Sequence, residues 1–544
     1  MVNFRRRTYG IPIMPLLLVA ILVSALVTVY TWNAGSMGSS RSTGSMGSSG
    51  SVGSLESSGM GKEPRGIHLT WAENDVYHTI AISWWTEEKT QKSLVLYDTV
   101  PHKDAIEKYP FIAEGEYAFR AEGTQHQIST SRSTWNCWYH DVILTGLEPG
   151  RTYYFVCGSP EGWSKEYSFR TIGLEQHVRF VFGGDSRIGA PVSSEIEGPV
   201  FPDARIAVSD AAAAEDPDFV LFCGDMVMHG YNERLWHLWL DDVAGHLVTD
   251  EGRIIPIVPA IGNHDLAYLA YYENGSWMDM TDYDYYRGIF ALPGNELWYT
   301  LDFPNIRLIV LCAAGGTGFS EPGRSFAERV EDEAKAQVGF LREQLRTATQ
   351  KWVITAQHVS ITGGYGLKPG DSGWGMIYHW VPVFEESLTN PDLAPMVLNL
   401  ASHSHHYVRT WPIAHLELPP DFVDFDYSLP PWDPKALWPN GPPIVELTRD
   451  SMKGVTYITN GVWGAPTEWM EKDSWIRIYP WFAAAYSRPG YCLIEDTPDG
   501  QLHVQFKHAG VVWSWYGLPQ VYDEFMLPYT APKHFPTAEY NVAF

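Results

Sequence analysis

The sequence predicts two folded units, an all-β sandwich of the immunoglobulin or fibronectin III type over residues 64–173 and an α/β domain over residues 174–544. Two observations predict this division. The first unit contains short runs of β-branched and aromatic residues bounded by polar residues, which is typical of strands. In the second unit, apolar runs that end in charged or imidazole side chains alternate with helix-like segments, which favours helices layered on a sheet.

The composition indicates a folded chain with an acidic surface. Hydrophobic residues make up 45% and charged residues 19% of the 544 positions, so most of the chain can bury a core. The formal net charge of −26 repels nucleic-acid backbones, and polymeric DNA or RNA is therefore not an expected partner. The net charge does not exclude small phosphorylated substrates, because bound metal ions can dominate the local electrostatic field.

The five cysteines predict little covalent cross-linking. Cys223 and Cys312 lie in apolar runs, where a buried thiol is expected. A disulfide between Cys137 and Cys157 is possible outside the cytoplasm, although the spacing alone does not establish it.

Residues 1–33 are predicted to be a membrane anchor. Arg5, Arg6 and Arg7 precede an apolar stretch from Ile11 to Tyr30 that is long enough to span a bilayer. Because basic residues beside such a stretch stay in the cytoplasm, the rest of the chain is expected to face outward. The alternative is a long signal peptide, and the protein would then be secreted.

Residues 34–63 are dominated by Gly, Ser and Met. Such a segment cannot bury enough apolar surface to offset its chain entropy. We expect a flexible linker that spans on the order of 30 Å and tethers the folded body to the membrane.

The unit over residues 64–173 is expected to pack and position rather than to catalyse. Thr79–Trp85, Ser93–Tyr97 and His140–Leu144 are strand-like runs. The stretch from Leu147 to Tyr153 contains a Pro-Gly turn followed by a tyrosine, an order that resembles the tyrosine corner of immunoglobulin-like sandwiches.

In the second unit, buried strand-like runs repeatedly end in residues that can bind metals. Ligands of α/β folds bind beyond the carboxyl ends of the strands, so these side chains are expected to meet at one place. Glycines before three of them are expected to permit the sharp turns that aim the side chains. The candidate metal ligands are Asp185, Asp225, Asn263, His358, His403 and His405.

This mixture of carboxylates and imidazoles suits Fe, Mn or Zn. A carboxylate can bridge two ions, and two ions about 3.5–4 Å apart can stabilise both the attacking and the leaving oxygen of a phosphoryl displacement. The residues themselves therefore favour a dinuclear phosphoesterase site.

The order of these motifs also carries a family resemblance. The sequence GD, GD, GNHD, a single His, and then HxH followed by Tyr407-Val408-Arg409-Thr410 is similar to that of the calcineurin-like metallophosphoesterases, and most to their purple acid phosphatase branch. That branch also places a fibronectin III-like domain upstream. The resemblance covers roughly residues 64 to 530, and it implies a four-layer α/β/β/α catalytic domain that hydrolyses phosphate esters.

The resemblance also implies a role for each residue. Asp185 and His405 would hold the first metal, Asp225 would bridge, and the remaining ligands, Asn263, His358 and His403, would hold the second. A metal-bound hydroxide would be the nucleophile.

Two further residues of the GNHD motif have implied catalytic roles. His264 would face the substrate and assist the leaving group or stabilise the transition state. Asp265 would orient His264 or raise its basicity.

Two positions depart from the family pattern. Met228 stands where the purple branch has a tyrosinate ligand, and Arg187 stands where the wider superfamily has a histidine ligand. The first metal therefore lacks one expected ligand, which water, substrate or His229 could replace. Arg187 is either a phosphate-binding side chain or part of a surface salt bridge.

Lys368, in a Gly-rich loop, could reach the substrate or could be solvated. Residues 411–450 are rich in Pro, Trp and Asp and could form a lid or a surface loop.

Hydrolysis of phosphate monoesters is the leading functional hypothesis. A phosphodiesterase or nucleotidase with the same site is a variant of this chemistry. The alternative from another class is a non-catalytic surface binding protein on a degenerate phosphatase scaffold, which the incomplete first metal site would suit. The presence of both Asp225 and His264 favours the enzyme, since a pure binder needs neither.

Overall fold

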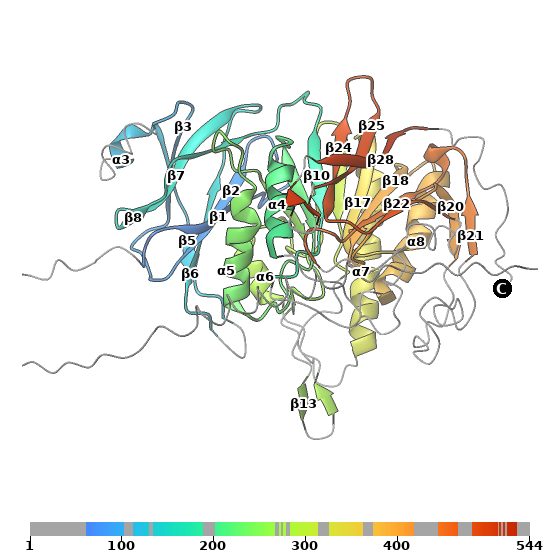
Figure 1. The fold of residues 1–544 in the computed structure, drawn as a ribbon, viewed down its shortest axis with the longest axis horizontal. Helices are drawn as coiled ribbons and strands as arrows, with labels where there is room; N and C mark the ends of the chain where they lie inside the picture. The colour runs from blue at the N-terminus through green and yellow to red at the C-terminus, as the bar shows by residue number, and fades with distance from the viewer. Residues whose placement is uncertain are drawn as a thin grey trace, which may run out of the picture. The chain divides into compact units, whose positions relative to one another are not determined.

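The computed structural model describes residues 61–529 except for 103–112, 130–133, 189–201, 267–270, 274–275, 279–282, 314–325, 363–373, 418–443, 466–480, 510, 513–514 and 517–518 (Figure 1). The predicted anchor over residues 1–33 and nearly all of the predicted linker lie outside these residues. So do Lys368 and most of the segment 411–450. Within the described residues, no helix is long and apolar enough to cross a membrane.

The N-terminal domain is the predicted β-sandwich. One sheet has the strand order β1-β2-β6-β5, and the other has the order β4-β3-β7-β8, with β9 paired to β7. The strands of the first sheet are β1 (Arg65–Thr70), β2 (Ile80–Thr86), β5 (Thr124–His126) and β6 (Trp138–Leu144). Those of the second are β3 (Leu94–Asp98), β4 (Phe119–Glu122), β7 (Thr152–Ser159), β8 (Gly162–Trp163) and β9 (Tyr167–Arg170), and a short helix, α3 (Ala113–Glu116), precedes β4.

The tyrosine corner is present. The phenol oxygen of Tyr153 accepts a hydrogen bond from the backbone N–H of Glu148 at 2.9 Å, and this bond ties the Pro-Gly turn to the start of β7. The cysteines of the two sheets are not bridged, because Cys137 and Cys157 are both free thiols. Cys223 and Cys312 are buried thiols, as predicted.

The C-terminal domain contains two sheets, packed face to face and flanked by helices. The first sheet has the order β12-β11-β10-β24-β25-β28 and the second β15-β16-β17-β18-β22-β19-β23. The strands of the first are β10 (Arg179–Gly183), β11 (Phe219–Cys223), β12 (Ile257–Ala260), β24 (Gly490–Asp496), β25 (Leu502–His508) and β28 (Gln520–Leu527). Those of the second are β15 (Tyr299–Asp302), β16 (Ile306–Val310), β17 (Trp352–Val359), β18 (Met396–Ser402), β19 (Tyr407–Thr410), β22 (Thr456–Asn460) and β23 (Phe482–Tyr486).

The helices complete the predicted α/β/β/α layering. In Figure 1, α4 (Pro202–Ala213) and α5 (Glu233–Asp242) lie on one side of the two sheets, and α7 (Phe326–Thr347) and α8 (Trp374–Thr389) lie on the other. The helix that the sequence predicts near residues 337–345 is the second half of α7. The smaller elements are η1 (Ala244–His246), β13 (Tyr271–Glu273), β14 (Ser276–Met278), α6 (Asp284–Ile289), β20 (Ile413–Glu417), β21 (Ile444–Leu447), η2 (Ser451–Lys453), β26 (Val511–Val512) and β27 (Trp515–Tyr516).

The sandwich and the C-terminal domain share one hydrophobic core. Trp71 of the sandwich lies edge-on to Phe219 of β11 and to Phe303, with ring centroids 6.2 and 5.9 Å apart. Trp85 of β2 stacks on His237 of α5 at 3.8 Å. The sandwich is therefore packed directly against the layer that carries the strand ends of the candidate site.

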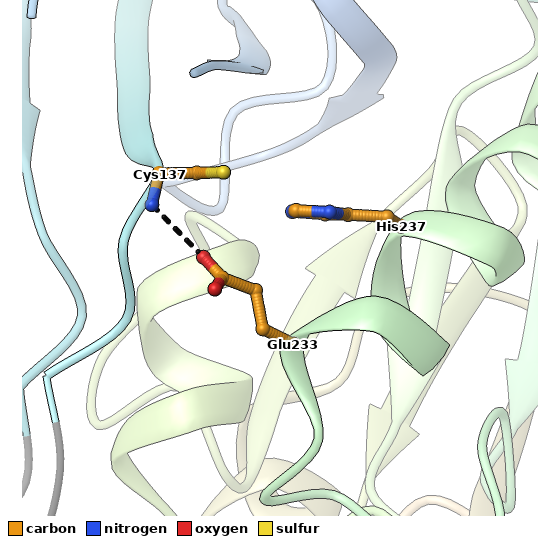
Figure 2. A group of neighbouring side chains, drawn as sticks. All are labelled: Cys137, Glu233 and His237. Carbon is orange, nitrogen blue, oxygen red and sulfur yellow. Dashed lines mark hydrogen bonds between the residues drawn. The ribbon is translucent and has the colours of Figure 1, made fainter. Parts of the chain in front are cut away.

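A second junction between the domains is polar. Figure 2 shows Cys137, at the start of β6, facing Glu233 and His237 in the first turns of α5. The Glu233 carboxylate accepts the backbone N–H groups of Asn136 and Cys137, at 3.2 and 3.0 Å. Such a trio could ligate a metal ion, but here the carboxylate is engaged by backbone donors, and His237 Nε2 lies 3.0 Å from the Tyr139 hydroxyl. The cluster therefore acts as a hydrogen-bonded junction.

Candidate metal centre

The six predicted ligands come from the ends of five strands. The parallel strands β10, β11 and β12 deliver Asp185, Asp225 and Asn263 from one sheet. The parallel strands β17 and β18 deliver the histidines from the facing sheet. Because β11 and β12 pack against β17, both sets of strand ends open onto the same place.

The backbone at this place is strained. Asp185, Asp225 and His403 have φ values of 62°, 51° and 69°, in the left-handed region that costs energy for residues other than glycine. The glycine expectation holds at Gly224, which has a φ of 78° before Asp225, whereas at Asp185 the aspartate itself takes the left-handed conformation. Gly262 has a different role, because a Cβ on it would lie 2.1 Å from the backbone nitrogen of Asp225.

Four of the candidate ligands lie close together, at the position predicted for the second metal. His358 Nε2 lies 3.1 Å from Asp225 Oδ1 and 3.1 Å from Asn263 Oδ1. His403 Nδ1 lies 3.1 Å from both Asn263 Oδ1 and His358 Nε2.

The tautomer of His358 decides what this group can bind. Its Nδ1 lies 2.7 Å from the carbonyl oxygen of Cys223, which can only accept, so Nδ1 carries the hydrogen and the Nε2 lone pair points at the other ligands. Electron pairs that face one another at this distance require a cation or an added proton between them. The donor set of the second position thus fits a metal ion, with a carboxylate, an amide oxygen and two imidazoles.

The first metal position is less complete. Asp185 Oδ1 lies 3.4 Å from His405 Nε2, and Asp185 Oδ2 accepts the backbone N–H of His403 at 2.7 Å. Asp185 is buried, and its Oδ1 makes no hydrogen bond to the described residues. This buried oxygen suits a cation.

The guanidinium of Arg187 lies in the site. Its Nη2 is 2.6 Å from His264 Nε2, its Nη1 is 3.2 Å from His405 Nε2, and its Nε is 3.9 Å from Asp225 Oδ2. Only 10% of the side chain is exposed. The side chain is therefore not on the surface, and the ion pair that it makes with Asp225 lies inside the site.

His264 is held in one orientation by the backbone. Its Nδ1 donates to the carbonyl oxygen of Met228 at 3.0 Å, and its Nε2 accepts from Arg187. Burial, together with the nearby Arg187 charge, lowers the pKa of His264, although Asp225 acts in the opposite direction. The imidazole is thus neutral in this arrangement.

The expected role of Asp265 needs a correction. In the described part of the chain its carboxylate accepts the backbone N–H groups of Met226, Val227 and Gly262, at 2.8, 3.2 and 2.9 Å. The carbonyl of Met228, not Asp265, therefore orients the His264 ring. Burial and the neighbouring Asp225 raise the pKa of Asp265 to about 8. The contacts of Asp265 thus fix the loops that carry the candidate ligands.

The two residues after Asp225 that could have completed the first position differ in placement. Met228 faces the site, with its Sδ 3.6 Å from Arg187 Nη2. His229 instead stacks on Tyr231, with ring centroids 5.5 Å apart, and is not placed among the ligands.

Sequence patterns did not identify two backbone acceptors that shape the site. The carbonyls of Cys223 and Met228 select the tautomers of His358 and His264. Any residue type presents a carbonyl, so only the geometry of the loops could identify them.

Two family models match the chain. The purple acid phosphatase N-terminal domain matches residues 64–171. The calcineurin-like phosphoesterase domain matches residues 199–407.

Curated relatives carry the names of acid phosphatases. Acid phosphatase type 7 of Danio rerio is 21% identical over 369 residues, which cover 65% of this chain and 73% of the relative. The Homo sapiens protein of the same name is 22% identical over 373 residues, 65% of this chain and 72% of the relative. Probable purple acid phosphatase 20 of Arabidopsis thaliana is 24% identical over 304 residues, 54% of this chain and 58% of the relative.

Solved structures share the fold. The purple acid phosphatase PPD1 from yellow lupin (Lupinus luteus) superposes with a TM-score of 0.53 and 16% identity, covering 86% of this chain and 74% of the other. PhoD superposes with a TM-score of 0.56 and 12% identity, covering 86% of this chain and 91% of the other.

Proposed function

Because this chain belongs to the calcineurin-like phosphoesterases and carries the N-terminal domain of purple acid phosphatases, we propose that it hydrolyses phosphate monoesters at the metal centre described above. The family supports a phosphoester hydrolase, and its members are dinuclear metal enzymes. The choice of monoesters over diesters or nucleotides is our proposal. The observation that supports a hydrolytic metal centre is the convergence of Asp225, Asn263, His358 and His403 on one point within hydrogen-bond distances.

These four residues would hold the second-site ion, with Fe, Mn and Zn as the candidates that the donors suit. When bound, such ions lower the pKa of water and neutralise charge on phosphoryl oxygens. A first ion would require Asp185 and His405, with Asp225 shared, and it would have to compete with the guanidinium of Arg187.

The remaining groups act on the substrate. Arg187 presents a planar, permanently charged fork that suits phosphate oxygens. When the fork turns to a phosphate, the lone pair of His264 Nε2 loses its hydrogen-bond donor, so this nitrogen can take up a proton from water and pass it to the leaving oxygen. Asp265 and the Cys223 carbonyl keep the ligand loops and the His358 ring in place.

The experiment uses the full-length chain, purified and loaded with Mn, Zn, Fe or Mg in turn. A generic aryl phosphate monoester and diester are the substrates. We expect turnover of the monoester with at least one ion, and we expect Asp225→Asn to abolish it. The matched control is Asp210→Asn, which alters a surface carboxylate of α4 that pairs with His246. No turnover with any ion would contradict the proposal, and a preference for the diester would shift it to a phosphodiesterase.

We further propose that the catalytic body faces outward, either tethered by residues 1–33 or secreted. The proposal rests on the basic and apolar pattern of the sequence. N-terminal sequencing of the mature protein, combined with membrane fractionation of the native host, tests it. An intact N-terminus in the cytosolic fraction would contradict it.

A further inference from the structure

The side chain of Arg187 contacts the atoms that a first metal ion would need. The imidazole of His405 offers its Nε2 to this position, and Arg187 Nη1 lies 3.2 Å from that nitrogen. Asp225 offers its Oδ2, which is 3.9 Å from Arg187 Nε. A hydrogen bond from the guanidinium and a bond to an ion use the same nitrogen lone pair, so the two exclude each other.

The guanidinium is held in place from several sides. The backbone of Arg187 has a φ of 41° and its N–H donates to the Asp225 carbonyl at 2.9 Å, which fixes the start of the side chain beside the bridging ligand. Its Nη2 contacts both His264 Nε2, at 2.6 Å, and Met228 Sδ, at 3.6 Å. A cation placed at this depth, with a tenth of its side chain exposed, repels a second cation.

The sequence changes that surround this position are consistent with one another. Met228 provides a thioether, a poor ligand for the ions that carboxylates and imidazoles select. Arg187 itself provides a charge where a neutral ligand would be needed. Both changes weaken the same position, whereas all four residues of the second position are present.

We propose that Arg187 stands in for the first metal ion, so that the protein as isolated binds one ion tightly and a second only when the guanidinium is removed. The inference rests on the proposed function, because it assumes that the second position binds metal. Asp185 Oδ1, buried and without a hydrogen bond to the described residues, is the ligand atom that remains ready for an ion once Arg187 leaves.

The test measures bound metal, not activity. The full-length chain is titrated with Zn²⁺ and, separately, with Mn²⁺, and bound metal per chain is determined by elemental analysis after dialysis and by calorimetry. We expect one tight equivalent in the wild type and two in Arg187→His, which supplies an imidazole in place of the guanidinium. Arg187→Lys keeps a cation at the position and should stay at one.

A double variant locates the added ion. Arg187→His combined with His405→Ala should return to one equivalent, because His405 is proposed as a ligand of the first position alone. Circular dichroism and thermal melting of each variant establish that it is folded. If the wild type binds two metal ions tightly per chain, the proposal is wrong, whatever the variants show.

The same measurements separate failure of the inference about Arg187 from failure of the proposed function. If the wild type binds no ion, and His358→Ala changes nothing, the second position and the phosphoesterase proposal both fail. If the wild type binds one ion but hydrolyses no phosphate ester, the inference about Arg187 survives and the proposed substrate class does not. If the wild type binds two ions and hydrolyses the monoester, only the inference about Arg187 is wrong.

Discussion

At the residue scale, backbone carbonyls decide which imidazole nitrogens carry a hydrogen and which present a lone pair to the site. The carbonyl of Cys223 takes the hydrogen of His358 Nδ1, and the carbonyl of Met228 takes that of His264 Nδ1. Each ring therefore turns its Nε2 lone pair into the site. One of these lone pairs suits a metal ion, and the other is paired with the guanidinium of Arg187.

The effect of replacing His264 should depend on the leaving group. We expect His264→Ala to lower kcat roughly 10²- to 10⁴-fold for an alkyl phosphate, whose leaving oxygen needs a proton, and much less for an activated aryl phosphate. Steady-state kinetics on the two substrates measure this difference. His229→Ala, which removes a ring that stacks on Tyr231 instead, is the control and should leave both rates unchanged. An equal loss on both substrates would mean that His264 acts only by positioning Arg187.

At the element scale, strand ends and irregularities aim the ligands. The register of β17 against β18 shifts between Ala356 and Val359, so His358 lies within a bulge of this strand. Bulges of this kind redirect a side chain without ending the strand.

In the sandwich, the His140 side chain of β6 links two other segments through hydrogen bonds. Its ring lies 2.9 Å from the hydroxyls of both Thr86, the last residue of β2, and Ser93, just before β3.

The buried His140 predicts loss of stability in mild acid. Burial lowers the pKa of His140 from 6.5 to about 3. In the window between these values the unfolded chain binds a proton that the folded chain does not, so stability falls as pH falls. Between pH 6.5 and 5 this one group should remove about 2 kcal/mol of unfolding free energy.

Urea denaturation at both pH values measures this effect. In His140→Gln the pH-dependent loss should be smaller than in the wild type by that amount. His78→Gln, which changes an exposed histidine paired with Asp75, should retain the wild-type dependence. An unchanged pH dependence in His140→Gln would show that the group is not responsible.

At the scale of the whole molecule, the two domains form one packed body over the described residues. The hydrophobic core runs from Trp71 in the sandwich to Phe222 beneath the site. The polar junction of Figure 2 adds a second connection, in which α5 of the catalytic domain holds the start of β6. Burial and the neighbouring Glu233 raise the pKa of the Cys137 thiol to about 12, so the thiol stays protonated there.

Removal of the Glu233 carboxylate should weaken the connection between the domains. Glu233→Ala removes the acceptor of two backbone N–H groups, one exposed and one partly buried, and we expect a loss of about 1 kcal/mol. Differential scanning calorimetry should show a lower first transition and, as the domains uncouple, a broader unfolding profile. The control is Glu251→Ala, at an exposed turn. Equal melting curves for the two variants would mean that the junction contributes nothing to stability.

The sequence by itself determined the two folds and the set of candidate ligands. Strand-like runs, the tyrosine corner of Tyr153 and the metal-competent residues at strand ends are local patterns, and parallel strands bring their carboxyl ends together in any such fold. The sandwich and an α/β unit followed from these patterns, whereas the four α/β/β/α layers were implied by the family resemblance. The roles of the individual ligands in metal binding are still predictions.

Only the tertiary structure decided how the site is filled. The reach of Arg187 into the first metal position depends on a turn with positive φ and on the loops opposite it, which no local pattern encodes. The same is true of Asp265, which binds the backbone of two loops instead of the imidazole beside it in sequence. Each strand supplies its candidate ligand from local sequence. The position for which the Arg187 guanidinium and a metal ion would compete is formed only when the two sheets pack together.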